Sequence, residues 1–215
     1  DDYWTDPLKL QKQVDFLEVN PDYVLCFHNA EVLSQNTGLK RKFIEKFDKL
    51  TYNGDDILLK WYIPTASMVF RKINDKNPDY MANASNGDLG LQLFLLNYGK
   101  AGLIDEIMSV YRKHEGGVMN HFNTLKYYNS YINQMNEMNL YFEKKYNLAL
   151  KNKIFYAYNQ IIRKKICSSN VHQMQIYLKI LTLNYKILLK NRKMFYTTTK
   201  CMLLNFRAKK NIIII

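Results

Sequence analysis

The sequence predicts an α/β unit followed by an all-α region, and three observations lead to this prediction. Short apolar runs suited to buried strands alternate with amphipathic helical patterns up to about residue 118. Beyond that point only helical periodicities remain, as in residues 174–188. The charge changes at the same place, from a net −3 over residues 1–116 to a net +15 over residues 117–215. We therefore expect two domains, 1–118 and 119–215.

The first expected element is a helix over residues 7–19. Asp6 followed by Pro7 is typical of a helix start, because aspartate caps free backbone N–H groups and proline fits the first turn. The Asn-Pro-Asp run from residue 20 ends the pattern. The apolar positions that predict the buried face of this helix are Leu10, Val14 and Leu17.

The next segments predict alternating strands and short helices. The apolar and aromatic run at 23–27 predicts a strand buried on both faces. Residues 66–71 and 103–111 are also strand-like. Short helices are expected at 41–50 and 56–61.

A polar loop at 72–87 leads into a leucine-rich amphipathic helix. On pattern alone, Asp88 is its N-cap and Gly99 its C-terminal cap. In the basic region, helices are expected over residues 119–148, 152–167 and 193–207, besides the helical face of residues 174–188.

Composition excludes several classes of protein. The chain has 215 residues, of which 47% are hydrophobic, so it can bury a core and is not disordered as a whole. No stretch reaches the roughly 18 apolar residues of a membrane-spanning helix. Cys26, Cys167 and Cys201 form neither a metal-binding signature nor a disulfide framework, which indicates a reducing compartment. The first residues do not form a signal peptide, and we expect the chain to be a fragment.

The basic C-terminal region leaves several interpretations open. Lys, Asn, Ile and Tyr are all favoured by AT-rich coding sequence, which would raise the charge without any binding partner. Alternatively, the region is a non-enzymatic basic helical binding or scaffold module, or its surface attracts anionic lipid. Lys and Tyr interleave from Lys144 to Lys200, but no recognisable nucleic-acid motif accompanies them, so no nucleic-acid partner is expected.

Several ordered segments resemble bacterial family 2 glycosyltransferases. Residues 1–13, Asp-Asp-Tyr-Trp-Thr-Asp-Pro-Leu-Lys-Leu-Gln-Lys-Gln, resemble the segment in which an acidic Glu/Asp-x-Asp-Asp motif precedes Tyr-Trp. Later segments of that family are resembled, in order, by residues 20–29, 63–71, 87–89 and 104–117. The resemblance covers about residues 1–118 and not the helical remainder.

The resemblance implies a GT-A-like mixed sheet with flanking helices and an inverting, hexosyltransferase-like enzyme. Asp1 and Asp2 would hold Mg²⁺ or Mn²⁺ against the diphosphate of a nucleotide-sugar donor. Asp2 and His114 would lie against that donor, and Asp88 would be the general base for the acceptor hydroxyl. A saccharide or lipid-linked acceptor would place the enzyme in cell-surface polysaccharide or glycoconjugate synthesis. The implied location is cytoplasmic, with peripheral contact at the inner face of the membrane as a further option.

Each of these residues also has a plain structural interpretation. Adjacent aspartates usually form a solvated turn, Asp88 suits a helix cap, and a loop histidine such as His114 is usually an exposed polar residue. The chain also departs from the family pattern. It begins inside the acidic motif, so the first nucleotide-binding half is missing and we expect weak or no activity from this piece alone. Leu89 stands where an aromatic residue is expected.

Overall fold

The chain forms two compact units, Asp1–His121 and Phe122–Ile215. The computed structural model describes residues 1–82, 84–117, 124–163 and 175. The four residues that the sequence singles out all belong to the first unit, which is therefore described in more detail.

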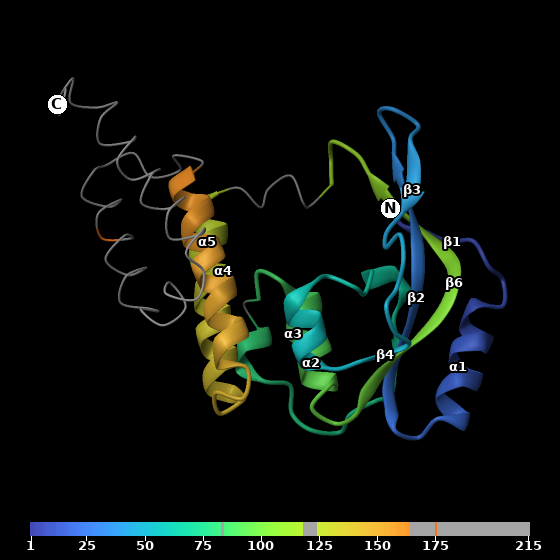
Figure 1. The fold of residues 1–215 in the computed structure, drawn as a ribbon, viewed down its shortest axis with the longest axis horizontal. Coiled ribbons are helices and arrows are strands. Elements are labelled where there is room, and N and C mark those ends of the chain that lie inside the picture. The colour runs from blue at the N-terminus through green and yellow to red at the C-terminus, as the bar shows by residue number, and fades with distance from the viewer. Residues whose placement is uncertain (83, 118–123, 164–174, 176–215) are drawn as a thin grey trace. The chain divides into compact units, whose positions relative to one another are not determined.

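Two long parallel strands form the centre of the first unit. They are β2 (Tyr23–Ser34) and β6 (Lys100–Lys113), and they run side by side over nearly their whole length (Figure 1). Most of β2 is buried, as its apolar sequence predicts for a strand covered on both faces. The expected strands at 23–27 and 103–111 are thus confirmed, and both extend further than predicted.

Four short antiparallel strands complete a six-stranded open sheet. Two of them, β1 (Tyr3–Trp4) and β4 (Thr51–Tyr52), pair with β6. The edge of β2 is shared by β3 (Lys40–Lys42) and β5 (Val69–Phe70). The unit is therefore a mixed α/β structure, as the sequence predicts.

Helix α1 (Lys9–Val19) lies on one face of the sheet, but with a different buried side from the one predicted. Leu17 is buried as expected, whereas Leu10 and Val14 are 47% and 45% exposed. The residues buried with Leu17 are Lys9 and Gln13. Both polar side chains find hydrogen-bond partners in the interior, so this face can be buried although it is not apolar.

On the other side of the sheet lie two helices that begin alike. Helix α2 (Gly54–Leu59) is capped by Asn53, and helix α3 (Gly87–Leu95) by Asn86, whose side chain accepts a hydrogen bond from the backbone N–H of Leu89. The prediction that Asp88 is the N-cap is therefore wrong. Asp88 lies one position after the first helical residue, with its carboxylate available for another contact.

Other local predictions also need correction. The expected helix at 41–50 is absent, because β3 pairs with β2 and the side-chain amide of Asn29 then binds both backbone groups of Ile44. The strand expected at 66–71 is only β5, preceded by a 3-10 turn, η1 (Thr65–Ser67). A second such turn, η2 (Asp79–Met81), precedes α3.

Gly99 does not cap α3, which ends at Leu95. It allows two backbones to approach closely, since a Cβ atom at this position would lie 2.7 Å from the carbonyl oxygen of Asp22. The sequence pattern marks Gly99 as structurally important, but the capping role that it predicts for this glycine is wrong.

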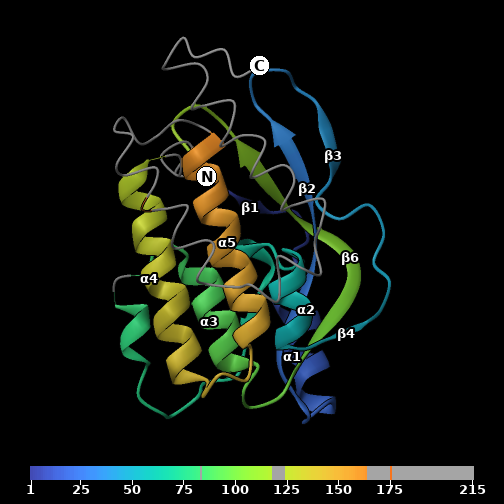
Figure 2. The ribbon, with the colours of Figure 1, turned by 60° about the vertical axis from the view of Figure 1, so that its left-hand side comes forward.

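In the second unit, α4 (Leu125–Tyr141) and α5 (Asn147–Arg163) pack against each other (Figure 2). Helix α4 lies within the helix expected over 119–148, whereas α5 begins at Asn147, before the expected start at 152, and runs through the predicted break. The helices expected at 174–188 and 193–207 lie outside the described residues. Among the residues that the structure describes, no helix is long and apolar enough to cross a membrane.

Candidate functional site

The first two residues of the chain lie beside the C-terminal end of β6. The pairing of β1 with β6 places Tyr3 opposite Val110, so Asp1 and Asp2 reach the residues that follow it. The imidazole Nε2 of His114 lies 2.5 Å from a carboxylate oxygen of Asp1. The backbone N–H of Arg112 donates a hydrogen bond to Asp2, with a length of 3.0 Å. Residues 1 and 2 thus meet residues 112 and 114, although they lie far apart in the sequence.

Asp88 is linked to this region by an electrostatic effect on Tyr111 of β6. The phenol of Tyr111 has a raised pKa, mainly because of burial and further because of the negative charges of Asp2 and Asp88. Both carboxylates therefore lie within electrostatic range of one β6 side chain. Asp1 and His114 are in direct contact, whereas Asp2 and Asp88 are linked through the effect of their charges on Tyr111.

Asp88 is held by a residue that sequence reasoning missed. The hydroxyl of Thr65, in the turn η1, donates a hydrogen bond to the Asp88 carboxylate. Asp88 also lies in the first turn of α3. Thr65 is twenty-three residues away along the chain, and no spacing rule links the two.

The carboxylates offer part of a metal-binding set. Within the described parts of the chain, no group of three or more His, Cys, Asp or Glu side chains is arranged to hold a metal ion. Mg²⁺ is commonly bound through one or two protein carboxylates, with substrate phosphate oxygens and water completing its octahedron. Asp1 and Asp2 fit a cation that is held in this way, rather than one enclosed by protein ligands.

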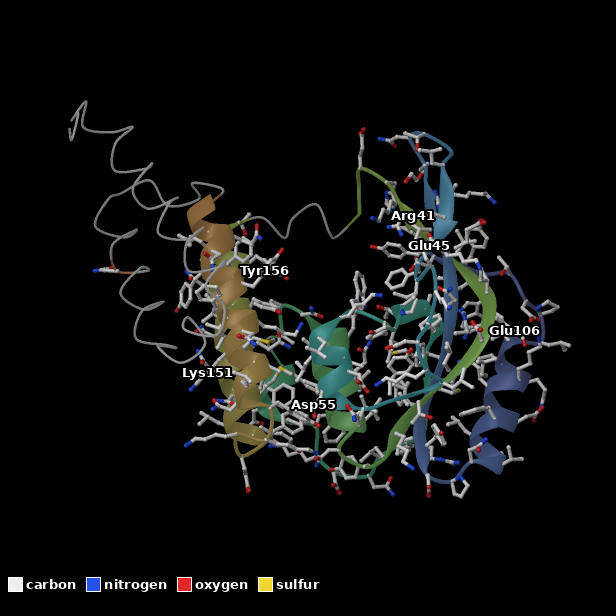
Figure 3. The ribbon with its side chains drawn as sticks, viewed as in Figure 1. Arg41, Glu45, Asp55, Glu106, Lys151 and Tyr156 are labelled. Carbon is white, nitrogen blue, oxygen red and sulfur yellow. The ribbon has the colours of Figure 1, made fainter. Side chains whose placement is uncertain are left out.

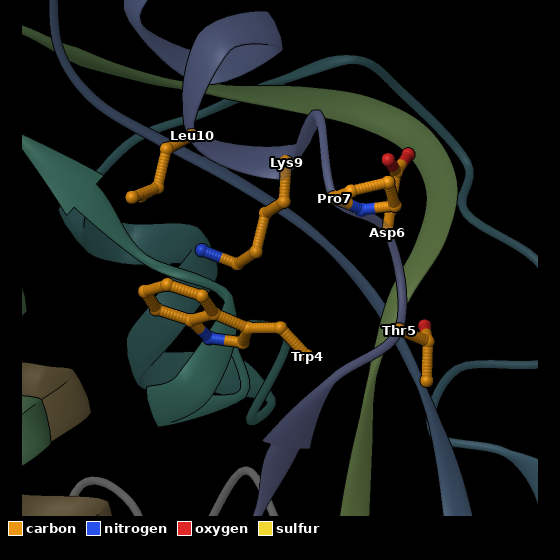
Figure 4. A pocket seen from close by; sticks show the side chains of 6 residues that line it. All are labelled: Trp4, Thr5, Asp6, Pro7, Lys9 and Leu10. Carbon is orange, nitrogen blue, oxygen red and sulfur yellow. The ribbon is translucent and has the colours of Figure 1, made fainter.

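Trp4 is a second residue that received no role from the sequence. Its indole N–H donates a hydrogen bond to the carbonyl oxygen of Ala66, with a length of 3.1 Å. The ammonium group of Lys9 lies 4.2 Å from the centre of its ring. Trp4 lines an open hollow of about 380 Å³ (Figure 4). The residues that line the hollow are Trp4, Thr5, Asp6, Pro7, Lys9 and Leu10.

The helix α1 is tied to this region by ionic and hydrogen-bond contacts. Glu106 projects from β6 on the α1 side, and the ammonium group of Lys12 lies 2.5 Å from its carboxylate (Figure 3). Lys12 also pairs with Asp6, at 2.8 Å. On the buried face, the side-chain amide of Gln13 donates a hydrogen bond to the carbonyl oxygen of Ser67, in the turn that carries Thr65.

Two buried groups beneath α1 are poor candidates for chemistry. Burial raises the pKa of the Cys26 thiol to about 11, which leaves it protonated and unreactive near neutral pH. Burial likewise lowers the pKa of His28 to about 4, so its imidazole is neutral. The His28 Nδ1 group bonds its neighbour Asn29 rather than a catalytic partner. We assign both residues to the packing of the sheet.

Comparison with known proteins finds relatives but no family. No family model matches the chain. Over 118 residues, which are 55% of this chain, it is 34% identical to an uncharacterized protein of Mycobacterium tuberculosis and to one of Mycobacterium bovis. The match is longer than the second unit and so extends into the first. The chain spans about a third of the length of these curated relatives.

Proposed function

We propose that the protein is an inverting, metal-dependent glycosyltransferase with a GT-A-like sheet, which transfers a sugar from a nucleotide-diphosphate sugar to an acceptor hydroxyl. The observation that carries the proposal is the contact of Asp1 with His114 at the C-terminal end of β6, where Arg112 also binds Asp2. Asp88 is linked to this place by the effect of its charge on Tyr111. Asp1, Asp2, Asp88 and His114 are the residues that the resemblance to family 2 glycosyltransferases selects. Nothing in the sequence spacing requires Asp1 and His114 to meet, so their contact supports a shared site.

In this proposal Asp88 is the general base. Its carboxylate removes the proton of the acceptor hydroxyl while the acceptor oxygen forms a bond to the anomeric carbon and the bond from that carbon to the diphosphate breaks. An inverting reaction needs one such base and no protein nucleophile. Thr65 holds the carboxylate in place. Asn86 caps α3, so the Asp88 carboxylate is not needed as the cap.

The donor side of the site comprises Asp1, Asp2 and His114. The two aspartates would hold Mg²⁺ or Mn²⁺ together with diphosphate oxygens, and His114, which contacts Asp1, would lie against the same diphosphate. When bound, a divalent cation would neutralise the negative charge that develops on the departing nucleoside diphosphate. The backbone N–H of Arg112 fixes the orientation of Asp2 for this role.

The proposal concerns the whole protein. The resemblance places residues 1–118 on the acceptor side of such an enzyme, and binding of the nucleotide would also need the half that precedes the acidic motif. We propose a role in the synthesis of cell-surface polysaccharides or glycoconjugates, on the cytoplasmic side of the membrane, where nucleotide sugars are available. The basic residues beyond 163 lie outside the described part of the chain.

Asp55 provides a matched control for testing the base. Both aspartates follow an Asn-Gly pair and occupy the same position in the first turn of a helix, Asp55 in α2 and Asp88 in α3. Asp88→Asn and Asp55→Asn therefore remove the same charge from the same helical environment. Only Asp88 lies at the proposed site.

The test measures release of nucleoside diphosphate by the full-length protein from a panel of nucleotide sugars, with Mg²⁺ or Mn²⁺ and with a chelator. We expect cation-dependent turnover that falls by about 10²- to 10⁴-fold in Asp88→Asn and is unchanged in Asp55→Asn. Equal turnover of Asp88→Asn and the unmodified protein would reject the base. Absence of turnover with every donor would reject the glycosyltransferase itself.

A further inference from the structure

Trp4 combines a fixed orientation with an exposed surface. Its side chain is anchored at one edge by the hydrogen bond to Ala66 and on one ring face by the ammonium group of Lys9. The residue is nevertheless 53% exposed. Since Lys9 covers one face of the indole, the exposed area lies on the opposite face and the free edge. An aromatic face held in this way is ready to bind a ligand without further loss of side-chain freedom.

The ammonium group of Lys9 is buried without an acidic partner. Lys9 is 1% exposed, and its ammonium group donates a hydrogen bond to the side-chain oxygen of Gln13, 2.7 Å away. Among the described residues, none of the ion pairs includes Lys9. The carboxylate of Asp6 points away from it and pairs with Lys12 instead (Figure 4). The positive charge therefore acts mainly on the Trp4 ring and on whatever occupies the hollow beside it.

The hollow lies next to the proposed base. Ala66, which accepts the hydrogen bond from Trp4, directly follows Thr65, which donates to Asp88. One peptide unit thus separates the anchor of the aromatic ring from the anchor of the carboxylate. Trp4 and Asp88 are therefore held by neighbouring residues of one turn, as an acceptor subsite beside the base would require.

We infer that the hollow beside Trp4 binds the sugar ring of the acceptor, and that this ring is uncharged or acidic. This inference rests on the proposed function. The C–H groups on one side of a pyranose form an apolar face that packs against the flat apolar surface of an indole. Thr5 also lines the hollow and carries a hydroxyl group, which suits a polyhydroxylated ligand. The ring size suits a hollow of about 380 Å³.

Lys9 sets the preference for the charge of the sugar. A cation on the inner face of the indole draws the π electrons toward itself and leaves the outer face less negative. An ammonium group on the ligand would lose cation–π attraction and would be repelled by Lys9 across a region of low dielectric. A free amino sugar is therefore disfavoured relative to the corresponding neutral sugar or uronic acid.

The two tryptophans of the chain allow a matched test. Trp61 is 42% exposed and also donates its indole N–H to a backbone carbonyl, that of Ile63, but its ring packs against Phe43 and Tyr111 and does not line the hollow. Trp61→Phe leaves Trp4 as the only indole, and Trp4→Phe leaves Trp61. The probes are methyl glucoside, galactoside, mannoside and rhamnoside, with methyl glucuronide and methyl glucosaminide for charge, added to the full chain without donor or cation.

We expect the fluorescence of Trp61→Phe to change saturably with at least one neutral probe, and that of Trp4→Phe to stay constant. Trp4→Ala should weaken binding of the same probe, measured by saturation-transfer NMR, by about tenfold. Circular dichroism of each variant checks that the fold is retained. No saturable response to any probe, or an equal response in both single-tryptophan variants, would overturn the inference.

Lys9→Met separates the charge from the packing, because it keeps the buried stem and removes the ammonium group. We expect this variant to bind methyl glucosaminide and methyl glucoside equally, whereas the unmodified chain prefers the glucoside. An unchanged preference would overturn the role of Lys9. Since these measurements need no donor, they are independent of turnover. Loss of activity in Asp88→Asn without any saccharide response at Trp4 would reject the subsite alone, and saccharide binding without any turnover would reject the transferase alone.

Discussion

Thr65 donates a hydrogen bond from its hydroxyl to the carboxylate of Asp88, and this contact joins the turn before β5 to the first turn of α3. The same turn is tied to β1 through Ala66 and Trp4, and to α1 through Ser67 and Gln13. Three elements, β1, α1 and α3, therefore converge on three consecutive residues. The orientation of Asp88 depends on this turn as much as on its own helix.

Removing the Thr65 hydroxyl should lower turnover without weakening substrate binding. In Thr65→Val the Asp88 carboxylate loses its donor and samples other rotamers, so we expect kcat to fall by about tenfold while KM is unchanged. Thr65→Ser keeps a hydroxyl at the same place and should restore the rate. Steady-state kinetics of the three proteins checks this. Equal rates in the Val and Ser variants would show that the contact does not position the base.

The buried imidazole of His28 should make the fold sensitive to acid. Burial lowers its pKa from 6.5 to about 4 in the folded chain, where its Nε2 has no hydrogen-bond partner among the described residues. As the pH falls below 6.5, the unfolded chain binds a proton that the folded chain does not, so stability decreases until about pH 4. The loss attributable to His28 is about 3 kcal/mol at most.

The measurement for His28 is the free energy of unfolding in urea at several pH values across that window. The nearby charges of Lys9, Asp6 and Glu106 also act on this imidazole, so the comparison is made with a variant in which they are unchanged. In His28→Gln the decline of stability between about pH 6.5 and 4 should be shallower than in the unmodified chain. Parallel declines would show that other groups cause the acid sensitivity.

Gly99→Ala should destabilise the first unit. The added methyl group would lie 2.7 Å from both the carbonyl oxygen of Asp22 and a methyl group of Val24, so β2 and the start of β6 would have to separate. We expect a loss of about 1–3 kcal/mol in the free energy of unfolding. Gly87→Ala is the control, since a Cβ at that helical position meets no atom within 4 Å. If the two variants are equally stable, the close approach at Gly99 is unimportant.

The sequence predicts the centre of the fold well because β2 and β6 are apolar over most of their length. It fails on α1, where Lys9 and Gln13 are buried and Leu10 is exposed. Hydrophobic periodicity measures apolar spacing only. The sequence of a polar pair four residues apart does not reveal whether that pair is exposed to solvent or buried. The buried partners that decide the case lie in other elements and are invisible to a local pattern.

At the site, too, local sequence identifies residues but does not predict the contacts between distant segments. The acidic and imidazole residues are recognisable by their resemblance, but their meeting depends on the pairing of β1 with the far end of β6. The capping of α3 by Asn86 rather than Asp88 is a choice between two acceptable capping residues, which position alone does not decide. Thr65 and Trp4 contribute through contacts across 23 and 62 residues, for which the sequence offers no spacing signal.

Strand β1 has only two residues, and its register with β6 consists of two Cα pairs. The anchoring of Asp1, Asp2 and Trp4 therefore depends on one of the smallest ladders in the sheet, while the parallel pair β2–β6 is long and buried. Short edge segments fray at a far lower free-energy cost than a central strand. The arrangement of Asp1 and Asp2 thus depends on the β1–β6 pairing, which can be weakened by a substitution that leaves the buried core intact.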